Sequence, residues 1–242
     1  MQVVYEDNHI IIVAKSSGEI VQGDKTGDTP LVELVKRYIK EKYNKPGEVF
    51  LGVVHRLDRP VSGLVVFART SKALTRLNRM FAEGEVHKTY WAVTAIPTTP
   101  DFSRGKRYED SSRKEEGSSI TLTHFLTRNE KQNKSYAYDR EVPHSKIAQL
   151  RYRVIGYAER YQLLEIELLT GRHHQIRCQL AKAGMPIRGD LKYGAPRSNP
   201  DGSISLLSRR IEFVHPVSKT LISVEAPLPP ENLWQVFKKK EI

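Results

Sequence analysis

Residues 53–67 read VVHRLDRPVSGLVVF and place one carboxylate, Asp58, between two arginines and directly before an apolar run. That apolar run predicts a buried strand. Pro60 restricts the turn in front of the strand, and Gly63 allows another backbone to approach closely. A lone acid in a basic turn is more often a surface residue than a catalyst, although loops also carry functional residues. The stretch alone therefore leaves two interpretations, a charged surface turn or an ionised catalytic carboxylate.

The pattern along the rest of the chain predicts an α+β fold with a mainly antiparallel sheet. Two short strands are expected in residues 2–15, around a turn at Asp7–Asn8. A helix should follow, with Thr29 as its N-cap and Pro30 at its first position. The other expected elements are helices over 71–86 and 171–184, strands over 87–96, 120–127, 134–141, 147–159 and 161–170, a hairpin over 209–229 and a C-terminal helix.

Composition limits the class of protein. The chain has 242 residues with a net charge of +11, and its basic surplus is spread as +3, +2 and +6 over residues 1–100, 101–150 and 151–242. A basic surface suits a polyanion such as nucleic acid, but a generally basic protein has the same composition. One cysteine forms no internal disulfide and no thiolate metal cluster. With neither a signal peptide nor a membrane span in the pattern, we expect a soluble cytoplasmic protein.

Three further segments bear on the function. Residues 170–180 read TGRHHQIRCQL, and on a helix Arg177 would follow His173 by four positions. The adjacent histidines should point away from each other, so metal binding there is not expected. In HKTYWAV, strand alternation places Lys88 and Tyr90 on one face, where the tyrosine could be core packing or stack on a nucleobase. Residues 97–119 form a polar surface excursion.

Together these segments resemble the RluA family of RNA pseudouridine synthases. The family's central motif H-R-L-D-x-x-x-S-G is matched by HRLDRPVSG, and its strand motif K-x-Y-x-A by KTYWAV. GRHHQIR, GMPIRGDLKYG and FVHPVSKTLISVEAPLP resemble three later family segments in the same order. The chain departs from the family in reading KSSG at 15–18 instead of K-P-x-G, and LLS at 206–208 instead of L-H-A.

The resemblance implies a single catalytic domain over residues 1–242, built on a long bent sheet flanked by helices and crossed by a central cleft. It implies an enzyme of the isomerase class that converts uridine to pseudouridine in RNA without a cofactor or metal. Asp58 resembles the catalytic aspartate, Tyr90 the active-site tyrosine, and Arg177 the basic partner of the aspartate. The accessory N-terminal RNA-binding domain of some relatives is expected to be absent.

RNA binding is expected from a set of residues beside these three. Arg56 resembles the residue that enters the RNA when the target uridine flips out. The full expected RNA-binding set is Arg56, His55, Arg59, Lys88, Arg172, His174 and Gln175.

The sequence also leaves competing functions. A non-catalytic RNA-binding or ribosome-assembly protein with the same fold is the main alternative to the enzyme. A glycoside hydrolase is disfavoured because it usually needs a second catalytic carboxyl group. The substrate is expected to be ribosomal or transfer RNA, and the protein is expected to be a monomer.

Overall fold

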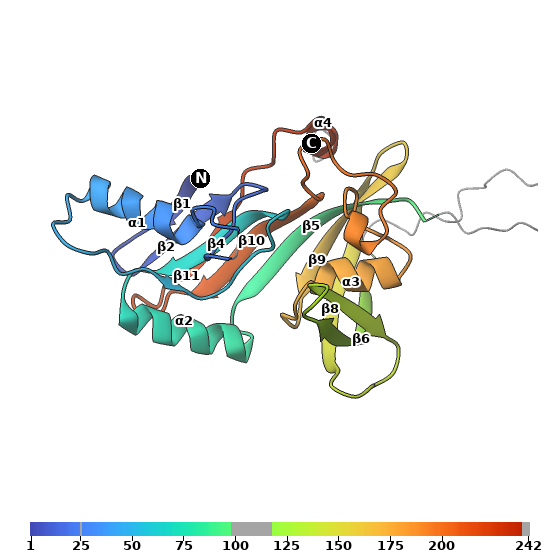
Figure 1. Cartoon of the computed structure of the whole chain (residues 1–242), viewed down its shortest axis with the longest axis horizontal. Helices are drawn as coiled ribbons and strands as arrows, with labels where there is room; N and C mark the ends of the chain where they lie inside the picture. Colours follow the sequence, from blue (N-terminus) through green and yellow to red (C-terminus); the bar gives the residue numbers. More distant parts are fainter. Residues whose placement is uncertain (25, 98–117, 239–242) are drawn as a thin grey trace, which may run out of the picture. The chain divides into compact units, whose positions relative to one another are not determined.

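The computed structural model describes residues 1–24, 26–97 and 118–238. It divides into two compact units, which are called unit 1 (Met1–Thr89 with Leu207–Pro229) and unit 2 (Tyr90–Leu206 with Pro230–Ile242). Figure 1 follows the chain through both units by colour. Most of the polar excursion expected at 97–119 lies outside the described residues.

Unit 1 is built on a sheet in which β1 (Gln2–Glu6), β2 (Ile10–Lys15), β4 (Ser62–Ala68) and β10 (Leu206–Val214) are neighbours in that order. The short strand β3 (Gly52–Val53) pairs with β4, and β11 (Leu221–Glu225) pairs with β10. Every pairing is antiparallel except β10 with β4, which is parallel. The apolar runs of β2 and β4 are almost wholly buried, as continuous hydrophobic strands in a sheet interior should be.

Two amphipathic helices accompany this sheet, α1 (Leu31–Lys42) and α2 (Ser71–Glu83). Helix α2 begins after Thr70, whose hydroxyl accepts the Ala73 N–H, and it ends at a left-handed Gly84. The predicted start of α1 was wrong by one residue. Pro30 has an extended backbone, with ψ of 154°, and is therefore itself the N-cap. The Leu31 N–H at the start of the helix bonds to the Ile20 carbonyl.

Unit 2 contains a second run of neighbouring strands (Figure 1), which begins with the part of β5 (His87–Ala95) from Tyr90 onward. It continues with β9 (Tyr161–Leu168), β8 (Lys146–Tyr157), β6 (Ile120–Asn129) and β7 (Lys134–Tyr138). Strands β9, β8, β6 and β7 pair antiparallel. Helix α3 (Gln175–Lys182), the 3₁₀ turn η1 (Leu191–Tyr193) and helix α4 (Asn232–Lys238) complete the unit.

A small apolar cluster joins α3 and η1 to the strands of unit 2. Its buried members are Leu126, Ala148, Cys178 and Tyr193. The α+β class and the predicted strands are confirmed. The expected bend, the central cleft and the single domain concern the arrangement of the two units, and they stay predictions.

The predicted helix over residues 171–184 was partly wrong. Helix α3 begins only at Gln175, because His174 takes a left-handed backbone with φ of 51°. The adjacent rings of His173 and His174 stack with centroids 3.8 Å apart, whereas the sequence indicated that they point away from each other. Helical spacing between His173 and Arg177 therefore does not apply.

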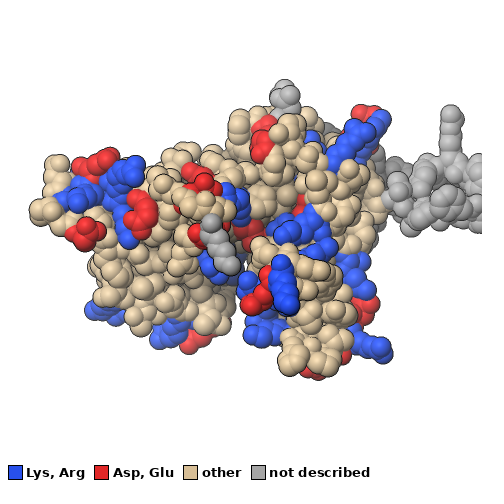
Figure 2. All heavy atoms as spheres, viewed as in Figure 1, with Lys and Arg blue, Asp and Glu red and all other residues tan. Residues whose placement is uncertain are grey.

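Figure 2 shows Lys and Arg atoms on the surface of both units, with Asp and Glu atoms among them. In the part of the chain that the structure describes, none of the helices has the length and apolar composition of a membrane-spanning segment.

Candidate active site

The ten predicted site residues fall into two sets, which the two units hold separately. Unit 1 carries the sequence neighbours of the aspartate, and unit 2 carries the tyrosine and the residues around α3. The sets are His55, Arg56, Asp58, Arg59 and Lys88 in unit 1, and Tyr90, Arg172, His174, Gln175 and Arg177 in unit 2.

The turn that carries Asp58, between β3 and β4, is fixed through its backbone carbonyls. The Val61 N–H donates to the Asp58 carbonyl at 3.0 Å, which closes the turn. The next carbonyl, that of Arg59, accepts the Gly18 N–H at 2.9 Å. The backbone around the half-buried Asp58 is thus tied to the loop after β2.

Lys15, at the end of β2, strengthens this attachment. Its side chain is only 2% exposed. The ammonium group donates to the carbonyls of Val61 at 2.6 Å, Ser16 at 2.9 Å and Arg59 at 3.1 Å. An ammonium has three N–H donors, and all three are used. Lys15 thereby bridges the strand and the turn that carries Asp58.

The sequence did not indicate this role for Lys15. Burial lowers the pKa of its ammonium to about 8, and the charges of Glu19 and Asp58 oppose that shift. Asp58 therefore has a cationic neighbour inside unit 1. A lysine that directly continues the apolar run IIIVA was the available clue, because a strand buried on both faces leaves its side chain little solvent.

The exit of the turn into β4 is equally constrained. The Ser17 hydroxyl donates to the Pro60 carbonyl at 3.3 Å. Gly63 has φ of 116°, and a Cβ there would lie 2.4 Å from the backbone oxygen of Ser208 on β10. The prediction that Gly63 permits a close backbone approach is confirmed, and it is this approach that forms the parallel β4–β10 pair.

The Arg59 side chain contacts the loop between β2 and α1. Its guanidinium contacts Asp28 at 2.6 Å and Asp24 at 3.4 Å, and donates to Thr26 at 2.7 Å. The side chain is 38% exposed, so these surface ion pairs contribute little to stability. The predicted RNA contact of Arg59 stays a prediction.

The His55 side chain makes internal contacts with β4 and α2. Its Nε2 accepts the Val66 N–H of β4 at 2.9 Å, and its ring stacks on Phe81 of α2 at 4.8 Å. Burial lowers the pKa of this imidazole to about 3, so it is neutral at pH 7. Burial likewise lowers the pKa of Lys88, whose ammonium lies 5.5 Å from the Phe81 ring. Arg56 is exposed.

In unit 2, Arg177 is held by a buried ion pair that the sequence did not reveal. Its Nε donates to Oδ2 of Asp190 at 2.7 Å, and its Nη2 donates to Oδ1 at 2.9 Å. The two side chains are 6% and 1% exposed. This bidentate geometry fixes the plane of the guanidinium. The predicted pairing of Arg177 with Asp58 is not tested by this contact and stays a prediction.

Tyr193, close after Asp190, secures the start of α3. Its hydroxyl accepts the Ser135 N–H at 2.8 Å and lies 2.9 Å from Nδ1 of His174. Its ring lies 5.1 Å from the Arg177 guanidinium. Burial raises the pKa of this phenol to about 12, so it stays protonated at neutral pH. The His174 ring, 7% exposed, is thus part of an internal contact.

Gln175 and Arg172 also make internal hydrogen bonds. The Gln175 Oε1 accepts from the Arg172 N–H at 2.9 Å and from Thr170 at 2.8 Å, and its Nε2 donates to the Gln149 carbonyl at 3.0 Å. The Arg172 Nε donates to the Ile147 carbonyl at 3.0 Å. These bonds hold the segment before α3 onto β8, and the predicted RNA contacts of both residues stay predictions.

Tyr90 lies on β5 and is 7% exposed. Because side chains alternate between the two faces of a strand, Tyr90 lies on the same face of β5 as Lys88. Within the described ranges 1–24, 26–97 and 118–238, no group of three or more His, Cys, Asp or Glu side chains is arranged to hold a metal ion.

Comparison with solved structures identifies the class of fold. The structure of human RNA Pseudouridylate Synthase Domain Containing 4 matches with a TM-score of 0.73 and 19% identity, covering 99% of this chain and 93% of that one. That of human RNA Pseudouridylate Synthase Domain Containing 1 matches with a TM-score of 0.66 and 21% identity, covering 98% and 86%. The fold is that of the pseudouridine synthases.

Sequence comparison identifies the family. The model of the RNA pseudouridylate synthase family matches residues 9–182. The chain is 32% identical to the mitochondrial pseudouridylate synthase RPUSD4 of Xenopus tropicalis, covering 96% of this chain and 73% of that protein. It is 30% identical to the uncharacterized RNA pseudouridine synthase YhcT of Bacillus subtilis, covering 98% and 72%. It is 28% identical to ribosomal large subunit pseudouridine synthase C of Vibrio cholerae, covering 93% and 65%.

The chain belongs to the RNA pseudouridylate synthase family. It is an enzyme of the isomerase class that converts uridine to pseudouridine in RNA. The expected enzymatic function is confirmed over a purely RNA-binding one.

Proposed function

We propose that Asp58 is the catalytic group of this uridine isomerisation, with Tyr90 and Arg177 as its partners. In the reaction the bond from the ribose C1′ to the uracil N1 breaks, the base turns, and C1′ bonds to C5. C5 loses a proton and N1 gains one, so no atom is added or removed. The Asp58 carboxylate has three possible roles: attack on the sugar, stabilisation of its positive charge, or removal of a sugar proton.

The observation that carries the proposal is the unbroken HRLDRPVSG match together with the way its backbone is held. A catalytic carboxylate needs a fixed position relative to the anomeric carbon. Lys15 and Gly18 fix the turn around Asp58 through its carbonyls. The ion pair with Asp190 orients Arg177, which would keep Asp58 ionised, and Tyr90 would assist proton removal from C5.

We further propose that the target uridine is flipped out of its helix before reaction. A paired base is unreachable inside a stem, and extruding it costs a few kcal/mol. Arg56 is exposed and lies two residues before Asp58, which suits a side chain that fills the vacated space. The proposed substrate is ribosomal or transfer RNA. Relatives whose names specify the large ribosomal subunit support the first, and the Arg-Pro pair after Asp58 resembles transfer-RNA members of the family.

The decisive test is Asp58→Asn, compared with Glu48→Gln, which neutralises an exposed acid elsewhere in unit 1. We expect Asp58→Asn to abolish pseudouridine formation in total RNA while its RNA affinity stays within about threefold of wild type. The control should retain full activity. Normal turnover by Asp58→Asn would disprove the catalytic assignment.

Mapping pseudouridine in total RNA with and without this gene identifies the substrate. Loss of a site from ribosomal RNA or from transfer RNA decides between the two proposed targets, and loss from neither contradicts both. The expected cytoplasmic location and monomeric state remain part of the proposal.

A further inference from the structure

The β6–β7 hairpin of unit 2 has one face anchored in the protein. Strands β6 and β7 pair antiparallel, with Thr127 opposite Tyr136. Ser135, which lies between Lys134 and Tyr136 on β7, is only 2% exposed, and its hydroxyl donates to the His173 carbonyl at 2.8 Å. The buried Cys178 of α3 donates its S–H to the Ser135 carbonyl at 3.2 Å. The hairpin is therefore a rigid platform and not a loose loop.

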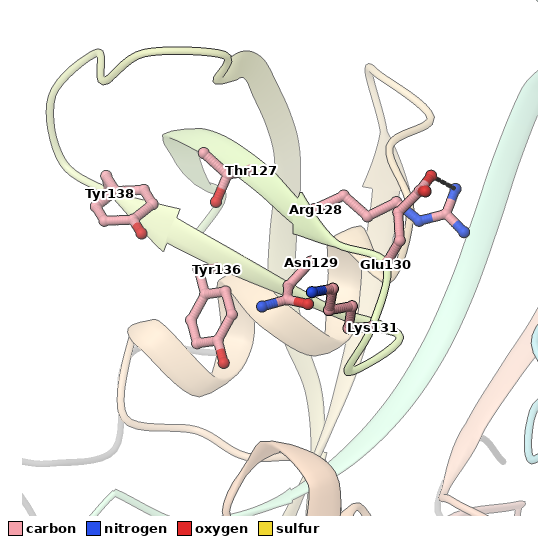
Figure 3. A pocket seen from close by; sticks show the side chains of 7 residues that line it. All are labelled: Thr127, Arg128, Asn129, Glu130, Lys131, Tyr136 and Tyr138. Carbon is pink, nitrogen blue, oxygen red and sulfur yellow. Dashed lines mark ion pairs between the residues drawn. The ribbon is translucent and has the colours of Figure 1, made fainter.

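The opposite face of the hairpin presents two tyrosines to solvent. Tyr136 and Tyr138 are 37% and 38% exposed, and strand alternation puts them on the same face, about 7 Å apart along the strand. They line an open hollow of about 580 Å³ together with Thr127, Asn129 and Lys131. Figure 3 shows these side chains from close by. Exposed aromatic rings beside polar groups are typical of surfaces that bind a partner.

The charge around this hollow favours an anionic partner. Lys131 lines the hollow, and Lys134 lies on the same face of β7 as the tyrosines. Arg128 lies opposite Ser135 and is 3.9 Å from Glu130, the single acid among the lining residues. The Lys134 ammonium lies 5.6 Å from the Tyr136 ring centroid. Stacking rings interleaved with cations suit unpaired nucleobases and their phosphates. A duplex would hide its base faces and use only the cations.

We propose that the face of the β6–β7 hairpin formed by Tyr136, Tyr138, Lys131 and Lys134 binds a single-stranded stretch of the substrate RNA. The tyrosine rings stack on unpaired bases, and the lysines contact the phosphates. The site gives the enzyme a preference for RNA with unpaired nucleotides near the target uridine. The proposal rests on the proposed function in that the ligand is the substrate RNA.

The test measures binding of a fluorescent single-stranded oligouridylate of about 12 nucleotides, a length within the usual range of such sites, and of an RNA duplex of equal length. The variant is Tyr136→Ala with Tyr138→Ala, in an Asp58→Asn background so that no turnover occurs. We expect single-strand affinity to fall at least about tenfold, while duplex affinity changes less than about twofold. The Tyr→Phe double variant keeps the rings and should bind like the parent.

Two controls sharpen the result. Tyr43→Ala removes another exposed tyrosine, 41% exposed in unit 1, and should leave both affinities unchanged. Lys131→Ala should weaken single-strand and duplex binding together and reduce the salt dependence by about one phosphate contact.

Unchanged single-strand binding in the tyrosine double variant would overturn the proposal and assign the hollow to another partner, such as a protein. Equal losses for single strand and duplex would also overturn it, because stacking would then not be the cause. Circular dichroism of the variant checks that the hairpin remains folded. Since these readouts measure affinity alone, they stand whether or not Asp58 proves to be catalytic.

Discussion

Asp58 in unit 1 and Arg177 in unit 2 are held in position by different kinds of interaction. The turn of Asp58 is fixed through main-chain carbonyls that accept from neighbouring N–H groups and from Lys15. Arg177 is fixed through its own side chain, by two bonds to Asp190. The first arrangement tolerates changes of side chain within the turn, whereas the second loses two buried, charge-assisted hydrogen bonds when either Arg177 or Asp190 is replaced.

The largest loss of stability is expected from Asp190→Ala, which removes the side chain that holds Arg177. We expect a loss of about 4 kcal/mol in the free energy of unfolding, because the buried Arg177 guanidinium loses both of its bonds to the Asp190 carboxylate. Urea denaturation measures it. Asp139→Ala is the matched control, since this acid is 75% exposed and pairs with Lys182 at the surface, and its loss should be at most about 1 kcal/mol. Equal effects of the two substitutions would contradict the assigned role of Asp190.

The next largest effect should come from Gly63→Ala in unit 1. The added Cβ would lie 2.4 Å from the Ser208 oxygen, and the residue has φ of 116°. We expect a loss of about 3 kcal/mol through backbone displacement and strain. Gly27→Ala has φ of 79° with nothing within 4 Å of its Cβ, so it should cost only about 1–2 kcal/mol. If Gly63→Ala were the milder change, the close β4–β10 approach would not be needed.

Lys15→Met tests the attachment of the turn itself. It leaves the carbonyls of Val61 and Ser16 without their donor but also removes a buried charge, so we expect a net loss of about 2 kcal/mol. Pseudouridine formation should fall as well, because the backbone beside Asp58 is released. Lys36→Met, at a surface pair with Glu33, should change stability by less than about 0.5 kcal/mol. Unaltered activity in Lys15→Met would show that the turn keeps its shape alone.

The smallest effect is a pH dependence in unit 1. Burial lowers the pKa of His55 to about 3 in the folded chain, against about 6.5 when unfolded. Between these values the unfolded chain binds a proton that the folded chain does not, so stability is lost as the pH falls below 6.5. From pH 7 to pH 5 the wild type should lose about 1–2 kcal/mol more than His55→Gln, whose amide oxygen can still accept the Val66 N–H. If the two stability curves were parallel, the folded chain would not keep the imidazole of the half-buried His55 neutral over this pH range.

Sequence patterns predicted the features that depend on the succession of residues within one strand or turn. The apolar runs of β2 and β4 and the alternation of β5 to β9 located the strands, because burial of a sheet face imposes its period on the sequence. Gly63 was correctly interpreted, since a glycine before a buried strand indicates a close backbone approach.

What the sequence did not predict depends on partners distant along the chain. The start of α3 is set by the left-handed His174 and its contact with Tyr193, 19 residues later. Asp190 gave no periodic pattern to identify it as the partner of Arg177. The bonds of Lys15 to the turn cross more than 40 residues, so only the fold reveals them.

The carbonyl attachment of the Asp58 turn has a consequence for how such an enzyme can diverge. Main-chain oxygens are present whichever amino acid occupies a position, so the turn can exchange its outward side chains and still present the carboxylate in one place. Arg56, exposed two residues before Asp58, can therefore be replaced without displacing the Asp58 carboxylate. With the proposed roles of Arg56 and Asp58, RNA recognition and catalysis would be separable within seven residues of chain, from His55 to Val61.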